Sequence, residues 1–170
     1  MIRSIKRCAK KLEEWKFRQG TLRAMFSQTT EYALRAVVWL AAHGAEPQTT
    51  VQIASKTRVP AGYLSKVLQA LGRADLVSSQ RGLYGGFTLT RPPDMISVLE
   101  VVNAVDPIRR IETCPLRLSS HGKELCALHR RLDDAIAHIE KAFSASSIAD
   151  LLTEPSNSHP LCEATSTEKP

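Results

Sequence analysis

A short stretch of this chain gathers the residue types that bind transition metals. Cys114 and Cys126 are separated by eleven residues, and His129 follows Cys126 after two more. His121 lies between the cysteines. Thiolates and imidazoles are ligands of zinc and of iron–sulfur clusters in proteins. The stretch therefore predicts either a cluster or a tetrahedral zinc site built from two cysteines and two histidines.

The same residues also have a metal-free interpretation, in which the cysteines are plain thiols and the histidines lie at the surface. No apolar run reaches the roughly 20 residues that a spanning helix needs, and the start lacks the apolar core of a secretory signal. We therefore expect a cytoplasmic protein without membrane contacts, in which cysteines stay mostly reduced. Cys8 lies far from the stretch and is assigned no role, whereas His159 and Cys162 in the tail are weaker ligand candidates.

Two predicted helices flank this loop, which spans about residues 106–129. The first covers Ser97 to Val105, and the second covers about Ala127 to Phe143. Apolar residues fall on one face of the second helix at helical spacing: Leu128, Leu132, Ala135, Ile136 and Ile139. The loop thus leads into a long helix, and the sequence does not show what packs against its apolar face.

Three shorter helices are predicted upstream. Ser27, Thr29 and Thr30 offer N-caps for the first, which Gly44 and Pro47 end. Thr49 or Thr50 caps the second, and Pro60 opens the third, which runs over residues 61–71 to Gly72. Three helices with short connections are typical of a helix-turn-helix unit.

A β-hairpin follows the third helix. Leu76-Val77 and residues 87–89 indicate short strands on either side of residues 81–86, and Pro92-Pro93 end the segment. The predicted fold is therefore mainly α with a small β-hairpin wing, a winged helix-turn-helix followed by a long helix.

This arrangement predicts binding to double-stranded DNA. The third helix would enter the major groove and the wing would contact the backbone, and residues 25–92 hold seven Lys or Arg against three Asp or Glu. Glycines in the wing allow tight turns and close approach to phosphate. The predicted DNA-contacting residues are Tyr63, Ser65, Lys66, Gln69, Arg73, Arg81, Gly82, Tyr84, Gly85 and Gly86.

Composition divides the chain into four segments. Residues 1–24 carry eight Lys or Arg against two Glu; they form a basic extension, either a disordered arm, a short amphipathic helix, or an artefact if Met25 is the true start. Residues 25–93 form the DNA-binding unit. Residues 94–152 hold a helix, the Cys/His loop and the long helix, and residues 153–170 are a tail predicted to be disordered.

Three segments resemble the IscR/NsrR family of bacterial regulators: Thr30-Glu31-Tyr32-Ala33-Leu34-Arg35, Tyr63-Leu64 with Leu68, and the wing from Leu76 to Phe87. The resemblance covers roughly Met25 to Leu152. It implies a homodimer whose long helices cross, two recognition helices on a partly palindromic operator, and an iron–sulfur cluster that sets DNA affinity.

Cluster-binding members of that family show three cysteines, each pair separated by five residues. Cys114 and Cys126 match the outer positions, but the middle position is Ser120. The resemblance therefore implies a site completed by His121, by His129, or by the partner's Glu31.

Three functions remain open from the sequence: a repressor that senses redox state, nitric oxide or iron through a cluster; a cluster-free or zinc-bound regulator gated by a small metabolite or a partner protein; and a scaffold. An enzyme is not expected, because the chain shows no catalytic triad order, phosphate-binding lysine loop or carboxylate pair.

Overall fold

The computed structural model describes residues 26–82, 84–115 and 124–154. The basic extension, Leu83, Ser120, His121 and the tail from residue 155 onward lie outside these ranges. In chain order the elements are α2 (Gln28–His43), α3 (Thr50–Thr57), α4 (Ala61–Arg73), β1 (Val77–Gln80), β2 (Gly86–Leu89), the 3-10 turn η1 (Pro93–Met95), α5 (Val98–Val105), α6 (Ala127–Ala145) and α7 (Ile148–Thr153).

Side-chain caps explain where several helices begin. The Ser27 hydroxyl accepts a hydrogen bond from the Thr30 backbone N–H, as the cap prediction for this helix requires. Thr49, rather than Thr50, caps α3 through a reciprocal capping box with Gln52. Such caps satisfy backbone N–H groups that lack a partner in the first turn. The same arrangement starts α5 at Ser97 and α7 at Ser147, and α7 was not predicted.

The hydrophobic core is continuous from the helix-turn-helix into α5 and α7. Helix α2 packs against α3, α4, α5 and α7, and its apolar side is fully buried at Ala33, Ala36 and Val37. Other core residues come from each neighbour: Ile53, Leu64, Val67, Leu68, Leu71, Leu76, Val98, Val101, Val102 and Ile148. Helices α5 and α4 share this core and are in direct contact. Because the core is closely packed, a displacement of α5 would also shift α4.

The β-hairpin is fastened to the helical body by a third backbone segment. Strands β1 and β2 pair antiparallel with Val77 opposite Leu89 and Gln80 opposite Gly86. Gln48, between α2 and α3, exchanges two backbone hydrogen bonds with Phe87, at 3.0 and 2.8 Å. A Cβ on Gly86 would lie 2.8 Å from the Gln48 backbone, so this close contact requires glycine.

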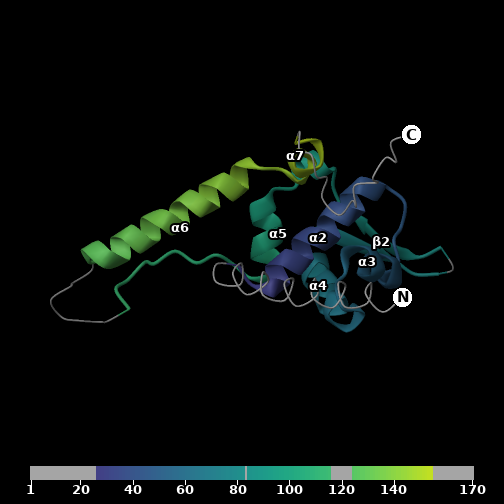
Figure 1. Cartoon of the computed structure of the whole chain (residues 1–170), viewed down its shortest axis with the longest axis horizontal. Helices are drawn as coiled ribbons and strands as arrows, with labels where there is room; N and C mark the ends of the chain where they lie inside the picture. The colour runs from purple at the N-terminus through teal and green to yellow at the C-terminus, as the bar shows by residue number, and fades with distance from the viewer. Residues whose placement is uncertain (1–25, 83, 116–123, 155–170) are drawn as a thin grey trace, which may run out of the picture.

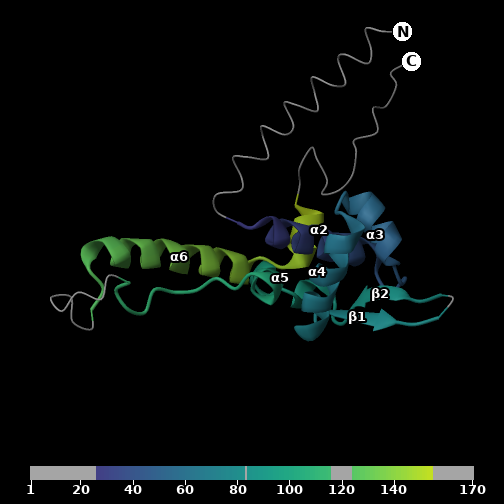
Figure 2. The same cartoon turned by 90° about the horizontal axis from the view of Figure 1, so that it is seen from below.

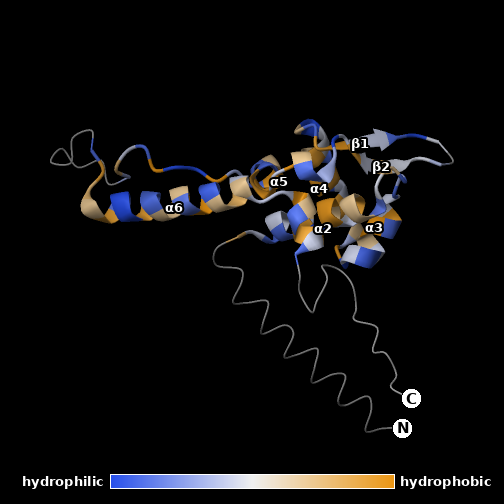
Figure 3. Cartoon of the chain, turned by 90° about the horizontal axis from the view of Figure 1, so that it is seen from above, coloured by the Kyte–Doolittle hydropathy of each residue, from blue (hydrophilic) through white to orange (hydrophobic). Residues whose placement is uncertain are grey.

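Helix α6 projects from the helical body on the side opposite the hairpin (Figures 1 and 2). Its base is held by backbone hydrogen bonds from Val98 to Ser146 and from Ile148 to Ile96, both 2.9 Å. Residues 107–115 run alongside the helix in both views. None of the α6 residues is buried in the single chain, and Figure 3 shows polar and apolar bands along its length.

Within the described ranges, the structure has no helix that combines the length and apolar character required to cross a membrane.

Candidate functional site

The predicted recognition helix α4 has one buried and one exposed side. Leu64, Val67, Leu68 and Leu71 face the core. Ser65, Lys66, Gln69 and Arg73 are exposed. The turn before α4 passes through Arg58, whose φ of 56° is left-handed, and the buried Val59. This geometry leaves polar and cationic side chains available to a DNA groove.

Tyr63 differs from the other predicted DNA-contacting residues of α4. Its side chain is 41% exposed, but its hydroxyl lies 2.6 Å from the Thr29 hydroxyl at the start of α2. Its ring also packs edge-on against Tyr32, with centroids 5.5 Å apart. Tyr63 therefore links α4 to α2.

The wing presents Arg81, Gly82 and Tyr84 to solvent, and Tyr84 is 87% exposed. Gly85 and Gly86 are half-buried. A side chain on Gly85 would collide with the Gln80 carbonyl oxygen, and its N–H donates to the Gly82 carbonyl at 3.0 Å. Both glycines thus have a structural role at the start of β2, in addition to any phosphate contact.

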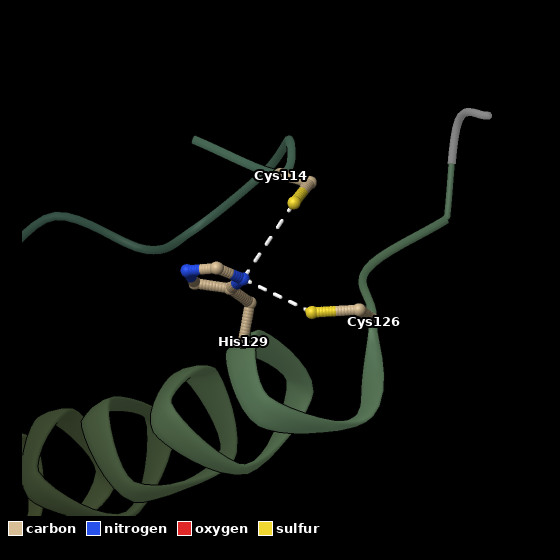
Figure 4. A group of neighbouring side chains, drawn as sticks. All are labelled: Cys114, Cys126 and His129. Carbon is tan, nitrogen blue, oxygen red and sulfur yellow. Dashed lines mark hydrogen bonds between the residues drawn. The ribbon is translucent and has the colours of Figure 1, made fainter. Parts of the chain in front are cut away.

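Cys114, Cys126 and His129 meet at the outer end of α6 (Figure 4). Their donor atoms all lie within 4.8 Å of one another. The Nδ1 atom of His129 lies 3.1 Å from the sulfur of Cys126 and 3.6 Å from that of Cys114. Cys114 is buried, and Cys126 is half-buried. The spacing noted in the sequence therefore places three metal-binding side chains together.

Two elements position this group. Cys126 is the N-cap of α6, and His129 lies about one turn further along, so both side chains fall on one side of the helix start. Cys114 arrives on the extended segment, which Asp133 of α6 holds in place. The Asp133 carboxylate accepts hydrogen bonds from the Arg110 guanidinium at 2.7 and 2.5 Å and from the Ile111 N–H at 2.8 Å.

The start of α6 favours a thiolate at Cys126. The backbone N–H of His129, and then its side chain, lower the pKa of the Cys126 thiol to about 7. A thiolate is the form in which cysteine binds metals. The Arg110 guanidinium and the Ile111 N–H lower the pKa of Asp133 to about 2, so the contact that holds the segment stays ionised near neutral pH.

The structure places only one of the two other predicted ligands. His121, like Ser120, lies outside the described residues. Glu31 lies on α2, away from the outer end of α6 (Figures 1 and 2), and it forms an ion pair with Arg35. Arg35 also donates to the Thr57 carbonyl at 3.2 Å. Sequence reasoning overlooked Asp133 and Arg110, whose pairing across 23 residues has no local signal.

Residues 26–154 match the model of the Rrf2 family, described as iron-dependent transcriptional regulators. The chain belongs to the Rrf2 family. The predicted resemblance to IscR/NsrR regulators is thereby confirmed, and the chain is a DNA-binding transcriptional regulator. Its relatives in the Rrf2 family are regulators and not enzymes, as predicted.

Individual Rrf2 relatives and structures agree with this assignment. The chain is 30% identical over 131 residues to the HTH-type transcriptional regulator NsrR of Geobacillus kaustophilus, covering 74% of this chain and 87% of the relative. It is 29% identical over 124 residues to IscR of Aliivibrio salmonicida, covering 72% and 74%.

The solved structure of CymR, the global cysteine regulator of B. subtilis, superposes with a TM-score of 0.65 at 24% identity, covering 77% of this chain and 98% of that chain. At this identity the likeness concerns the fold alone. It confirms the predicted fold, mainly helical with a hairpin wing. The Cys-Cys-His group and the IscR and NsrR relatives are compatible with binding of a metal or cluster.

Proposed function

We propose that this Rrf2 regulator is a homodimeric repressor that binds a partly palindromic operator and responds to redox state, nitric oxide or iron through an iron–sulfur cluster. One observation carries the sensing part of the proposal: the donor atoms of Cys114, Cys126 and His129 lie within 4.8 Å of one another.

The donor set fits the proposed group. Clusters take thiolate ligands and also accept imidazole, as two thiols and one histidine provide here. When bound, a cluster supplies a centre whose integrity and charge respond to oxidants, nitric oxide and iron supply. The resemblance implies a further ligand from His121 or from the partner's Glu31. A Glu31 ligand requires its ion pair with Arg35 to open.

The chain offers a route from the site to the DNA-binding face. Holding Cys114 at the start of α6 fixes the far end of the extended segment, whose near end follows α5 directly. Helix α5 packs against α4. Asp133 still holds Arg110 and Ile111 after Cys114 is released. The release therefore loosens the segment beyond Ile111 and weakens, rather than removes, the restraint on α5 and, through it, on the recognition helix. A switch between mostly bound and mostly free operator requires the two states to differ by about 3–5 kcal/mol in DNA affinity.

The proposed dimer rests on the apolar stripe of α6, formed by Leu128, Leu132, Ala135, Ile136 and Ile139. Leu128 is 63% and Leu132 is 48% exposed in the single chain. The neighbouring side of α6 is occupied by this chain's own segment, through His129, Asp133 and Glu140. A second copy of α6 would bury the stripe, as amphipathic helices do when they pair.

The sensing proposal is tested by anaerobic purification, a visible absorption spectrum, and assays of iron, zinc and acid-labile sulfide. We expect broad absorption between about 320 and 450 nm with matching iron and sulfide. Cys114→Ser, Cys126→Ser and His129→Ala should each lower the iron content. His138→Ala is the matched control, because His138 is an exposed histidine of α6 outside the group. A colourless protein that cannot be reconstituted, with stoichiometric zinc or no metal, would reject the cluster.

The DNA-binding face is tested on a duplex selected by the wild-type protein from a random library. The double variant Lys66→Ala and Arg81→Ala should weaken DNA binding. It should also make the slope of log K against log salt concentration shallower by up to about 2, roughly one for each lost phosphate contact. Lys141→Ala, at an exposed position of α6, should leave both unchanged. Unchanged affinity in the double variant would reject the assigned face.

A further inference from the structure

We propose that Cys114 and Cys126 are also a covalent modification site: in the metal-free protein a hydroperoxide oxidises them to an intrachain disulfide that excludes metal. The inference concerns the site of the proposed function and relies on it for the competition with metal. The disulfide itself rests on the placement of the two sulfur atoms.

The two thiols are close enough to react after a side-chain rotation. Their sulfur atoms lie within 4.8 Å, whereas a disulfide requires about 2.05 Å. Rotation of χ1 between staggered positions moves a cysteine sulfur by about 3 Å. Figure 4 shows that the two side chains approach the same imidazole nitrogen from different segments, one from the extended stretch and one from the helix start.

The backbone brings the thiols together independently of a metal. The hydrogen bonds from Arg110 and Ile111 to Asp133 are 2.5 to 2.8 Å long and hold the extended segment against α6. Cys114 follows three residues after Ile111, and Cys126 begins the helix that carries Asp133. Tethering of this kind gives the thiols a high effective concentration relative to each other.

The sequence makes this pairing unique within the loop. Ser120 occupies the position between the two cysteines, and a hydroxyl forms no disulfide. When one of these two thiols is oxidised to a sulfenic acid, the other is therefore the loop thiol that can attack it to form the disulfide.

Exposure assigns the order of the two steps. Cys126 is half-buried, whereas Cys114 is buried, so an oxidant in solvent reaches Cys126 first. The Cys126 sulfur attacks one oxygen of the hydroperoxide, the O–O bond breaks, and an alcohol, or water from hydrogen peroxide, leaves with a proton. Cys126 is then a sulfenic acid.

The Cys114 sulfur next attacks the Cys126 sulfur. The S–S bond forms, the S–O bond breaks, and water leaves. The two thiols together lose two electrons, which reduce the hydroperoxide. Both metal-binding thiols are consumed, so the disulfide and a bound metal exclude each other until a thiol reductant reopens the site.

The test uses the full chain, stripped with a chelator, reduced and freed of reductant, with Cys8→Ser and Cys162→Ser so that only the loop thiols remain. One equivalent of hydrogen peroxide should remove both free thiols and lower the chain mass by about 2 Da. Dithiothreitol should reverse both changes. Peptide mapping of the oxidised wild-type chain should recover Cys114 joined to Cys126. This measurement tests the disulfide even if the chain with Cys8→Ser and Cys162→Ser does not fold.

Cys114→Ser in the same background should instead trap a sulfenic acid at Cys126, detected as a dimedone adduct. In the protein that retains Cys114, accumulation of the same adduct with Cys114 still a free thiol would overturn the inference. Disulfides found only between two chains would overturn it as well.

Competition is measured with Zn²⁺ alone: the reduced protein should bind it, and the oxidised protein should bind at least tenfold more weakly, about 1.4 kcal/mol. Disulfide formation without Zn²⁺ binding would leave the modification site standing and reject its competition with metal, while the iron and sulfide assays test the cluster separately. Zn²⁺ binding without a disulfide would reject the modification site and leave the metal site standing.

Discussion

The hydroxyl groups of Thr29 and Tyr63 lie 2.6 Å apart, and this hydrogen bond joins the first turn of α2 to the first turn of α4. The Tyr63 ring also packs edge-on against Tyr32 of α2. Helix α4, the predicted recognition helix, is thus held at its N-terminal end by side chains of α2, in addition to its buried stripe. Tyr63 positions α4 before any DNA is present.

Removing this hydrogen bond should destabilise the protein by a small, non-additive amount. Tyr63→Phe and Thr29→Val should each lower the free energy of unfolding by about 0.5–1.5 kcal/mol, and the double variant should cost little more than either alone. Urea unfolding provides the measurement, with Tyr84→Phe in the exposed wing as control. Additive effects of the two substitutions would contradict the contact.

DNA binding by the same variants separates positioning from direct contact. If Tyr63 acts by holding α4, then Tyr63→Phe and Thr29→Val should weaken operator binding equally. A loss confined to Tyr63→Phe would assign the hydroxyl to DNA itself.

The Asp133 contact should make part of the stability depend on pH. The pKa of Asp133 is lowered to about 2 in the folded protein, below its ordinary value of about 3.9 when unfolded. A lowered carboxyl pKa adds stability above about pH 4, which is lost as the pH falls toward 2. Asp133→Asn should therefore be less stable than wild type at pH 7, and the difference should shrink below pH 4. Asp134→Asn is the neighbouring exposed control, and a difference independent of pH would contradict the assignment.

The Cys126 thiol should react as a thiolate near neutral pH. In the metal-free protein, the rate of alkylation of Cys126 by iodoacetamide should be half-maximal near pH 7, because its pKa is lowered to about 7. His129→Ala should raise that midpoint only part of the way to 9.0, since the backbone N–H of residue 129 is the largest cause and remains. Mass spectrometry resolves the site, and His138→Ala should leave the midpoint in place. A midpoint unchanged by His129→Ala would exclude the imidazole as a cause.

The two glycines at positions 62 and 86 should respond oppositely to alanine. Gly86→Ala places a Cβ 2.8 Å from the Gln48 backbone, so we expect a loss of about 1–3 kcal/mol. Gly62→Ala in α4 meets no atom within 4 Å, and alanine favours helix by up to about 1 kcal/mol. Thermal unfolding of both variants makes the comparison. A tolerated Gly86→Ala would show that the wing can detach from Gln48 without cost.

The proposed dimer should depend on the apolar stripe of α6. Leu132→Glu should weaken self-association by about tenfold or more, because burial of one leucine contributes about 1.5–3 kcal/mol. Arg131→Glu, at the adjacent exposed position, should change it much less. Sedimentation equilibrium measures both. An unchanged association constant for Leu132→Glu would move the interface away from this stripe.

Local patterns predicted the elements that have local causes. The caps at Ser27 and Thr49 and the buried stripe of α4 follow from residue type and spacing over a few positions. Ser147 and Asp150 carried the same kind of signal for α7, but it was overlooked at the end of a longer helix. Strand β1 extends to Gln80 through exposed polar residues. Backbone pairing with β2 makes these residues a strand, and the alternation of apolar and polar side chains gives no sign of it.

Contacts between distant residues could not be predicted in this way. The spacing of Cys114, Cys126 and His129 indicated a shared site because they belong to one loop and the following turn. Asp133 reaches back to Arg110, and Gln48 pairs with Phe87, only because the folded backbone brings them together. Tyr63 was assigned to the DNA face because it lies off the buried stripe, and its bond to Thr29 spans 34 residues.

Cys126 and His129 lie in the first turn of a helix that has no buried residue, and the ends of such helices fray. Whatever binds these side chains must therefore also order that turn, and its apparent affinity includes the free energy of ordering it. A substitution between Cys126 and Asp133 that favours helix would tighten binding without touching the site. The tip of the projecting arm thus couples helix propensity in its first turns to ligand affinity.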